Sequence, residues 1–159
     1  MSALPMPEEP ITRVYLHPGQ MIVTTEESMV MTVLGSCVAV CLWDPRMRIA
    51  GINHYLLPQG PGSGAGDPRY GNTAMERLID NVLTRGASPE RLVAKIFGGA
   101  SVIEVFSGQR RAIGEQNVQV AREALTRHGV RVHADETGGK HGRKLLFHTG
   151  NGSVFMKEI

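Results

Sequence analysis

The segment VLGSCVAVCLWDPRMRIAGINHYLL, residues 33–57, contains two apolar runs that are separated by a turn sequence. The first run, VAVCLW (38–43), is apolar at every position, which is typical of a strand whose sheet is covered on both faces. After the DPRM turn, RIAGINHYLL (48–57) predicts a second strand. We therefore expect an antiparallel hairpin whose first strand is buried on both sides.

The remaining sequence predicts more strands and two helices. The first helix follows residue 72, where TAME (73–76) has the form of a capping box, and the second covers about 113–128. Many strands with two helices indicate an α/β or α+β fold, a single-domain layered sandwich in which a mixed sheet carries helices. The other expected strands are 13–17, 21–25, 29–34, 92–97, 130–134, 143–149 and 153–159.

The domain organisation follows from the composition along the chain. Residues 1–12 contain three prolines and few apolar side chains, so we expect an irregular tail there and one domain over residues 13–159. Residues 58–72, PQGPGSGAGDPRYGN, are rich in glycine and proline and predict a long surface loop. We do not expect a domain boundary at this loop, because the strands before it have no helices of their own to cover them.

Composition excludes several classes of function. The 159 residues carry a formal charge of only +2, and the basic residues are dispersed, which does not favour nucleic-acid binding. No apolar stretch reaches the roughly 20 residues that cross a bilayer, and the first residues do not resemble a signal peptide. Two cysteines fit a reducing compartment. We expect a cytoplasmic protein with no membrane insertion, no metal site and no cofactor, since zinc-ligand spacings and a phosphate-loop motif are both missing.

Cys37 is the candidate nucleophile. It follows Gly35 and Ser36, so the backbone can bend sharply and a substrate can come close to the sulfur. Backbone N–H groups in such a turn also suit an oxyanion hole. The alternative is that Cys37 is simply a buried thiol, as free cysteines often are. Cys41, in the middle of the predicted strand, is interpreted as structural.

His54 is the candidate base among six histidines. If Trp43 pairs with Arg48 in the hairpin, His54 lies directly opposite Cys37, where Cβ atoms are about 4.5–5.5 Å apart. The alternative is a surface histidine or a hydrogen-bonded core histidine. A Cys–His pair hydrolyses acyl compounds, but the pair alone does not distinguish a peptide, a side-chain amide or an ester.

Five motifs together resemble the chemoreceptor glutamine deamidase family, CheD. They follow one another in order from about residue 12 to the C-terminus, and none would suffice alone. The motifs are LGSCVAVCLWD, GINHYLLP, KIFGGAS, IGEQNV and DETGGKHGRKLLFHTGNGSVFMK.

The resemblance implies an enzyme with a CheD-like α/β fold and a Cys–His pair. It would hydrolyse particular glutamine side chains to glutamate on the cytoplasmic helices of methyl-accepting chemotaxis receptors, and some members also hydrolyse glutamate methyl esters. It further implies that a CheC-type phosphatase can be a partner. By position, Cys37 is the nucleophile and His54 the base, the pair that the strand register also selects, with Gly35 and Ser36 at the oxyanion pocket.

The sequence departs from the family pattern at one position. The resemblance implies a catalytic threonine six residues before the cysteine, and that position is Met31, with Thr32 beside it. Successive strand residues face opposite sides, so Thr32 is expected to serve only if a bulge re-aims it. The departure keeps a second function open, a weakly active or inactive module that binds receptors or a phosphatase. A general cysteine protease or acyltransferase fits the pair but not the motif set.

Overall fold

The computed structural model describes residues 11–60, 66–101 and 107–159. Most of the predicted tail and residues 61–65 of the predicted loop lie outside these residues. The elements are β1 (Thr12–Tyr15), β2 (Met21–Thr24), β3 (Ser28–Leu34), β4 (Val38–Asp44), β5 (Ile49–Asn53), α1 (Gly71–Thr84), β6 (Val93–Gly98), α2 (Ser107–Arg127), β7 (Arg131–Thr137), β8 (Arg143–His148) and β9 (Val154–Glu158).

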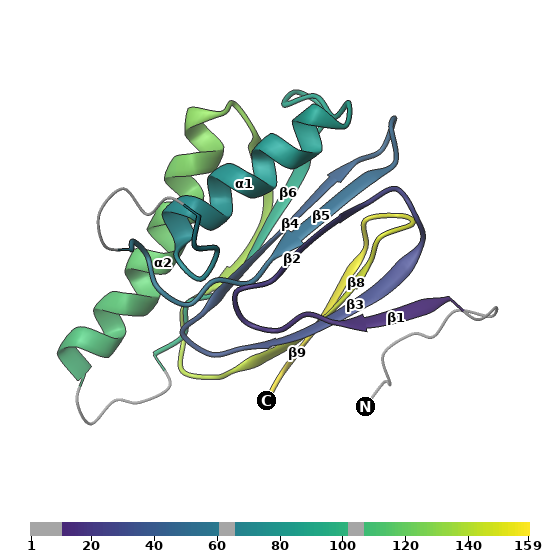
Figure 1. Ribbon diagram of the computed structural model, residues 1–159. Helices are drawn as coiled ribbons and strands as arrows, with labels where there is room; N and C mark the ends of the chain where they lie inside the picture. Colours follow the sequence, from purple (N-terminus) through teal and green to yellow (C-terminus); the bar gives the residue numbers. More distant parts are fainter. Residues whose placement is uncertain (1–10, 61–65, 102–106) are drawn as a thin grey trace.

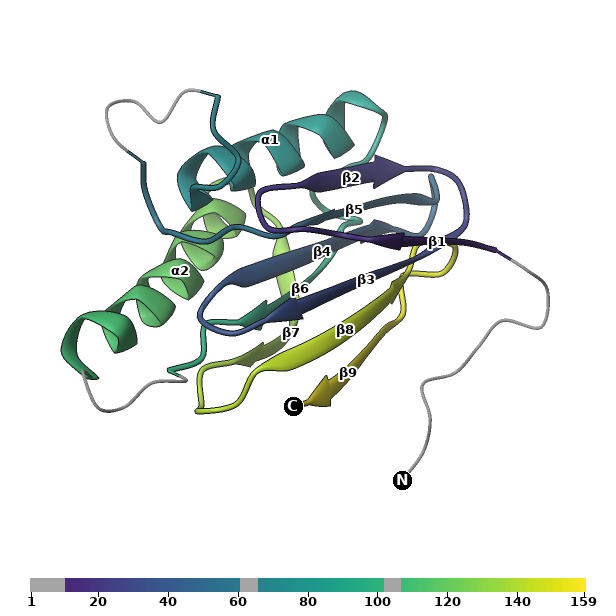
Figure 2. The same cartoon turned by 60° about the horizontal axis from the view of Figure 1, so that its bottom comes forward.

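The elements form three layers, and the predicted layered α/β fold is confirmed. One sheet has the strand order β1-β3-β8-β9 and the other β2-β5-β4-β6-β7. Figures 1 and 2 show both helices on one face of the five-stranded sheet, with the four-stranded sheet on its other face. The chain therefore has two apolar cores, one between the helices and the five-stranded sheet and one between the two sheets.

Strand β4 separates the two cores, as its sequence predicts. All seven of its residues are buried. Val38, Val40 and Leu42 face the helices, whereas Ala39 and Cys41 face the other sheet. Because successive side chains of a strand point to opposite faces, a strand between two cores has apolar side chains on both faces, as residues 38–43 do.

The β4–β5 hairpin has a different register from the predicted one. Trp43 pairs with Ala50 and Asp44 with Ile49, so the predicted pairing of Trp43 with Arg48 is wrong. Arg48 belongs to the turn: its φ angle is 55°, in the left-handed region, and its N–H donates to the Asp44 carbonyl oxygen at 2.8 Å. The buried Asp44 carboxylate holds this turn, because it accepts hydrogen bonds from the N–H groups of Arg46 and Met47 and binds Arg91.

Both helices begin earlier than the sequence predicts. Helix α1 begins at Gly71 with Tyr70 at its N-cap, and no side chain caps it, so the capping box at 73–76 is not formed. Helix α2 begins at Ser107 rather than near residue 113. Within the described residues, neither helix is long and apolar enough to cross a membrane.

Candidate functional site

Thr32 and His54 meet in the layer between the two sheets. Strand β3 pairs with β8 in an unbroken register, so Thr32 faces this layer without the bulge that the sequence analysis required. Its side chain is fully buried, and its hydroxyl oxygen lies 2.7 Å from Nδ1 of His54. Thr32, and not Met31 at the position before it, is therefore the hydroxyl residue at this histidine.

The hydrogen bonds of Thr32 determine the tautomer of His54. The hydroxyl donates to the carbonyl oxygen of Leu16 at 2.7 Å, so it can only accept from the histidine. Nδ1 must then carry the proton, which leaves Nε2 with a free lone pair. Nε2 is buried and has no hydrogen-bond partner among the described residues. A buried acceptor without a partner is costly in a merely structural residue, and it is what a proton acceptor requires.

Burial keeps His54 neutral. The side chain is only 2% exposed, and removal from water lowers the pKa of the imidazole to about 4. The charged form is penalised because no carboxylate of the described residues offsets the loss of water, whereas the Thr32 hydroxyl is an uncharged partner. At neutral pH the ring is therefore a base with a free Nε2 lone pair.

Cys37 lies just before β4 and faces the same layer. Its half-buried side chain packs against the core between the sheets, which also contains Ala39. Val38 and Tyr55 form a bridge, so His54 is opposite Ala39 and diagonal to Cys37, not directly opposite it. Diagonal neighbours on one face are about 7–8 Å apart at the backbone, and their side chains can approach more closely.

The two thiols differ in environment. Burial raises the pKa of Cys37, and its own backbone N–H opposes that shift by stabilising the thiolate. Cys41 is 2% exposed, and burial raises its pKa much further. In the free protein Cys37 is therefore a thiol on the same sheet face as a neutral imidazole, and a proton must move when the sulfur reacts.

Hydrogen bonds to its carbonyl oxygens hold the turn that contains Gly35 and Ser36. The Ala100 N–H donates to the Gly35 oxygen at 3.0 Å, and the Gly99 N–H donates to the Cys37 oxygen at 2.9 Å. The Ser36 oxygen accepts from Nδ2 of Asn117 at 2.9 Å. In a trans peptide the N–H points away from the preceding C=O, so the N–H groups of Ser36 and Cys37 point away from these anchors.

The glycines of the KIFGGAS motif allow this close approach. Gly98 has a φ angle of 113°, and a Cβ atom there would overlap the carbonyl oxygen of Cys37. A Cβ on Gly99 would contact Val118 and the backbone of Gly114. The motif therefore brings the end of β6 against both the Cys37 turn and helix α2.

Two buried polar residues at this end of the sandwich were missed by the sequence analysis. Arg143 of β8, which the sequence placed in a strand without a further role, is only 8% exposed. It donates to the carbonyl oxygens of Gly98 at 3.1 Å and Gly138 at 2.8 Å and so joins the two sheets. Asn117 of α2 is fully buried. Its position within the apolar stripe of that helix, next to Val118, was the available signal.

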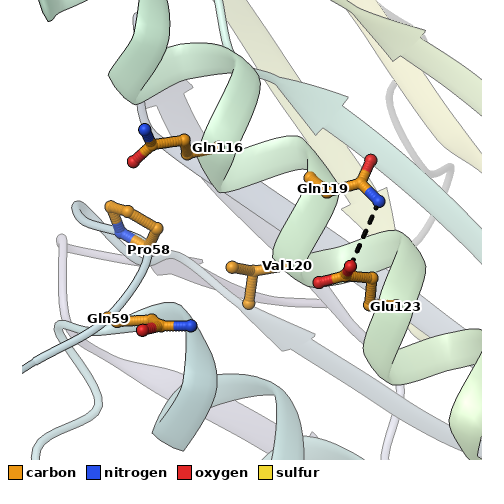
Figure 3. Close-up of a pocket in the computed structure, with 6 residues that line it drawn as sticks. All are labelled: Pro58, Gln59, Gln116, Gln119, Val120 and Glu123. Atoms are coloured by element: carbon orange, nitrogen blue, oxygen red, sulfur yellow. Dashed lines mark hydrogen bonds between the residues drawn. The ribbon is translucent and has the colours of Figure 1, made fainter.

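One cavity lies beside the site rather than at it. It has a volume of about 410 Å³ and lies between the segment after β5 and helix α2. Figure 3 shows Pro58 and Gln59 facing Gln116 and Val120 across this cavity, with Gln119 hydrogen-bonded to Glu123. Neither Cys37 nor His54 lines it. Within the described ranges, no three His, Cys, Asp or Glu side chains gather as metal ligands would.

The fold and the site define a layered α/β protein that holds a cysteine and a threonine-bound histidine on one inner sheet face. Residues 56–158 match the family model described as CheD chemotactic sensory transduction. The chain belongs to this CheD family, and the resemblance of its motifs is confirmed.

Relatives agree over almost the whole chain. The chain is 46% identical over 147 residues to a "Probable chemoreceptor glutamine deamidase CheD" of Trichlorobacter lovleyi, covering 92% of this chain and 91% of the relative. It is 40% identical over 145 residues to a protein of the same name from Sulfurimonas denitrificans, covering 91% and 93%. A "Probable chemoreceptor glutamine deamidase CheD 1" of Anaeromyxobacter dehalogenans is 44% identical over 147 residues, covering 92% and 85%.

Proposed function

We propose that this protein is a cytoplasmic hydrolase that deamidates glutamine side chains on the cytoplasmic helices of methyl-accepting chemotaxis receptors. The names of its relatives support the substrate, since each is a probable chemoreceptor glutamine deamidase. One observation carries the chemistry: His54 is neutral and bound to Thr32, and its Nε2 is unpartnered on the sheet face that Cys37 shares.

In the first half-reaction, Cys37 is the nucleophile and His54 the base. Nε2 of His54 takes the proton from the thiol as the sulfur attacks the side-chain carbonyl carbon of the glutamine. The tetrahedral intermediate collapses when the imidazolium returns that proton to the nitrogen, so ammonia leaves and a thioester remains. Thr32 holds the ring throughout through Nδ1.

In the second half-reaction, water takes the place of the leaving group. Nε2 accepts a proton from the water as its oxygen attacks the thioester carbon, and the proton then passes to the departing sulfur. The products are a glutamate side chain and the free Cys37 thiol. A single imidazole thus serves as base and acid in both halves.

The oxyanion that forms in each half-reaction needs hydrogen-bond donors. We assign this role to the N–H groups of Ser36 and Cys37, because their peptide carbonyls are anchored on the opposite side by Ala100 and Asn117. Donors fixed in this way need no reorganisation as charge develops. Gly35 contributes the carbonyl oxygen that accepts from the Ala100 N–H.

The partial exposure of Cys37 supports receptor glutamines as substrates. Cys37 is half-buried at the edge of the sandwich, so a side chain that projects from a folded helix can reach it without unwinding that helix. A protease site would instead have to accommodate an extended main chain. Methyl ester hydrolysis would follow the same steps with methanol as the leaving group.

The alternative function, an inactive binding module, rested on Met31 at the expected threonine position. Because Thr32 supplies the hydroxyl group to His54, the geometry favours the enzyme. A CheC-type phosphatase as a further partner stays a prediction.

Mass spectrometry of receptor cytoplasmic fragments tests the proposal. After incubation with the wild-type protein, specific glutamines should gain the small mass that replaces NH2 with OH, and ammonia should be released in equal amount. Cys37→Ala should produce neither change, whereas Cys41→Ala should retain activity because its thiol is buried in the core. Binding of the fragments without any mass change would support the module instead.

A further inference from the structure

Asn117 contacts the segments on both sides of the proposed catalytic pair. Its Nδ2 donates to the carbonyl oxygen of Ser36 at 2.9 Å and to that of Leu56 at 3.0 Å. Its own backbone oxygen accepts the hydroxyl of Tyr55. Ser36 directly precedes Cys37 in the chain, while Tyr55 and Leu56 directly follow His54.

Helix α2 packs closely against the segment that follows β6. Gly114, one turn before Asn117, lies against the backbone of Gly99, and Val118 packs on the same glycine. Gly99 in turn donates to the Cys37 carbonyl. Helix α2, the Gly98–Gly99 segment and the turn before Cys37 therefore pack directly against one another. This packing holds the carboxamide of Asn117 near the carbonyl groups of Ser36 and Leu56.

The bond to Ser36 orients the peptide that follows it. This C=O and the N–H of Cys37 belong to one planar trans peptide, so a carbonyl held toward α2 turns the N–H away from the helix. That N–H lies beside the thiol of its own residue, where it stabilises the thiolate. An unanchored peptide could rotate and withdraw this donor.

The side-chain amide of Asn117 acts as a hydrogen-bond donor, because both of its partners are carbonyl oxygens. The side chain is fully buried, and Oδ1 has no partner among the described residues. The reversed orientation of the amide would place Oδ1 against two carbonyl oxygens, so the donor assignment is unambiguous. Leaving one acceptor unpaired is a cost that the two carbonyl bonds must offset.

We propose that Asn117 is a positioning residue that fixes the Ser36–Cys37 peptide, so that its N–H faces both the thiol and the substrate carbonyl oxygen. The second bond, to Leu56, keeps the segment after His54 aligned with the cysteine turn. This inference rests on the proposed deamidase function, and it adds a residue that contacts neither the substrate nor the reacting atoms.

The test compares two neutral variants with a control of similar stability. Asn117→Leu preserves the side-chain shape without a donor, and Asn117→Ser is shorter and remains polar. Leu125→Ala is the control: Leu125 is fully buried on the same helix, two turns from Asn117, so its truncation loosens packing without freeing either carbonyl. If one Asn117 variant fails to fold, the other carries the comparison.

Two readouts are measured on each folded protein. Loss of an oriented oxyanion donor should lower kcat for the receptor fragment by about 10–100-fold with KM within about twofold of wild type. The pH profile of Cys37 alkylation by iodoacetamide should also shift to higher pH, because the thiolate loses the hydrogen bond from its own backbone N–H. Leu125→Ala should lower the melting temperature but leave kcat and the alkylation profile unchanged.

Two results would overturn the assignment. One is an Asn117 variant with wild-type kcat and an unshifted alkylation profile. The other is a Leu125→Ala protein that loses both properties to the same extent. If the wild-type protein releases no ammonia, the proposed function fails, and the alkylation profile still decides whether Asn117 orients the peptide.

Discussion

The hydroxyl oxygen of Thr32, on the four-stranded sheet, lies 2.7 Å from Nδ1 of His54, directly after β5 of the five-stranded sheet. One hydrogen bond therefore couples the packing of the two sheets to the protonation pattern of the imidazole. Because Thr32 also donates to Leu16, the bond fixes which nitrogen faces the reacting groups. The proposed chemistry depends on this connection between layers.

Loss of the Thr32 hydroxyl should remove the hydrogen bond that orients the imidazole of His54. Thr32→Val keeps the shape of the side chain but leaves the N–H of His54 without an acceptor. We expect kcat to fall by about 10–100-fold, since a displaced base loses alignment with the sulfur. Thr32→Ser retains the hydroxyl and should stay within a few-fold of wild type. Equal activities for the Val and Ser variants in a steady-state ammonia assay would rule out this role.

The pH dependence of kcat/KM should report the buried histidine. The reaction needs neutral His54, and burial lowers its pKa to about 4. Activity should therefore persist as pH falls through 6 and decline only near pH 4, because kcat/KM follows the ionisations of the free enzyme. An acid limb centred near the ordinary histidine pKa of about 6.5 would show that the imidazole is solvated or charge-stabilised.

Acid should also destabilise the fold through His54. Its pKa is about 4 when folded and 6.5 in the unfolded chain, so between these values the unfolded state binds more protons. The free energy of unfolding should thus fall as pH drops from 6.5 to 4, by up to about 3 kcal/mol from this residue. Urea unfolding of the wild type and of His54→Gln at several pH values measures it. Parallel curves for the two proteins would contradict the prediction.

Gly98 should tolerate no side chain. A Cβ there would overlap the Cys37 carbonyl oxygen, and the φ angle of 113° disfavours any other residue. Gly98→Ala should lower both the melting temperature and kcat, because the Cys37 turn must move. Gly129→Ala is the matched control: its φ angle is 71°, nothing lies within 4 Å, and only the backbone strain of about 1–2 kcal/mol applies. Wild-type kcat in Gly98→Ala would argue against a tightly held turn.

Local sequence patterns predict the layers well and the register poorly. The uninterrupted apolar run of β4 correctly indicates a strand between two cores. The hairpin register instead depends on Arg48, which adopts a left-handed conformation, and on hydrogen bonds within the turn to Asp44. Neither feature follows from hydrophobic periodicity, so the strand pairing was predicted two residues out of place.

Residues that act across layers are the hardest to find from sequence. The partner of His54 is on the other sheet, so the side on which Thr32 faces depends on how the two sheets pack. Asn117 and Arg143 are polar residues to which the sequence analysis assigned no role, yet both are buried against backbone carbonyls. Only the packed structure shows which carbonyl groups they bind.

The most direct test of the central claim is an acid-quenched single turnover of a receptor fragment, followed by mass spectrometry of the protein. The account predicts a transient adduct on Cys37 whose mass is that of the protein plus the fragment minus ammonia. It should form in the wild type and be absent in Cys37→Ala. Deamidation at the wild-type rate by Cys37→Ala, or turnover with no adduct at any quench time, would contradict a mechanism in which this sulfur attacks the glutamine.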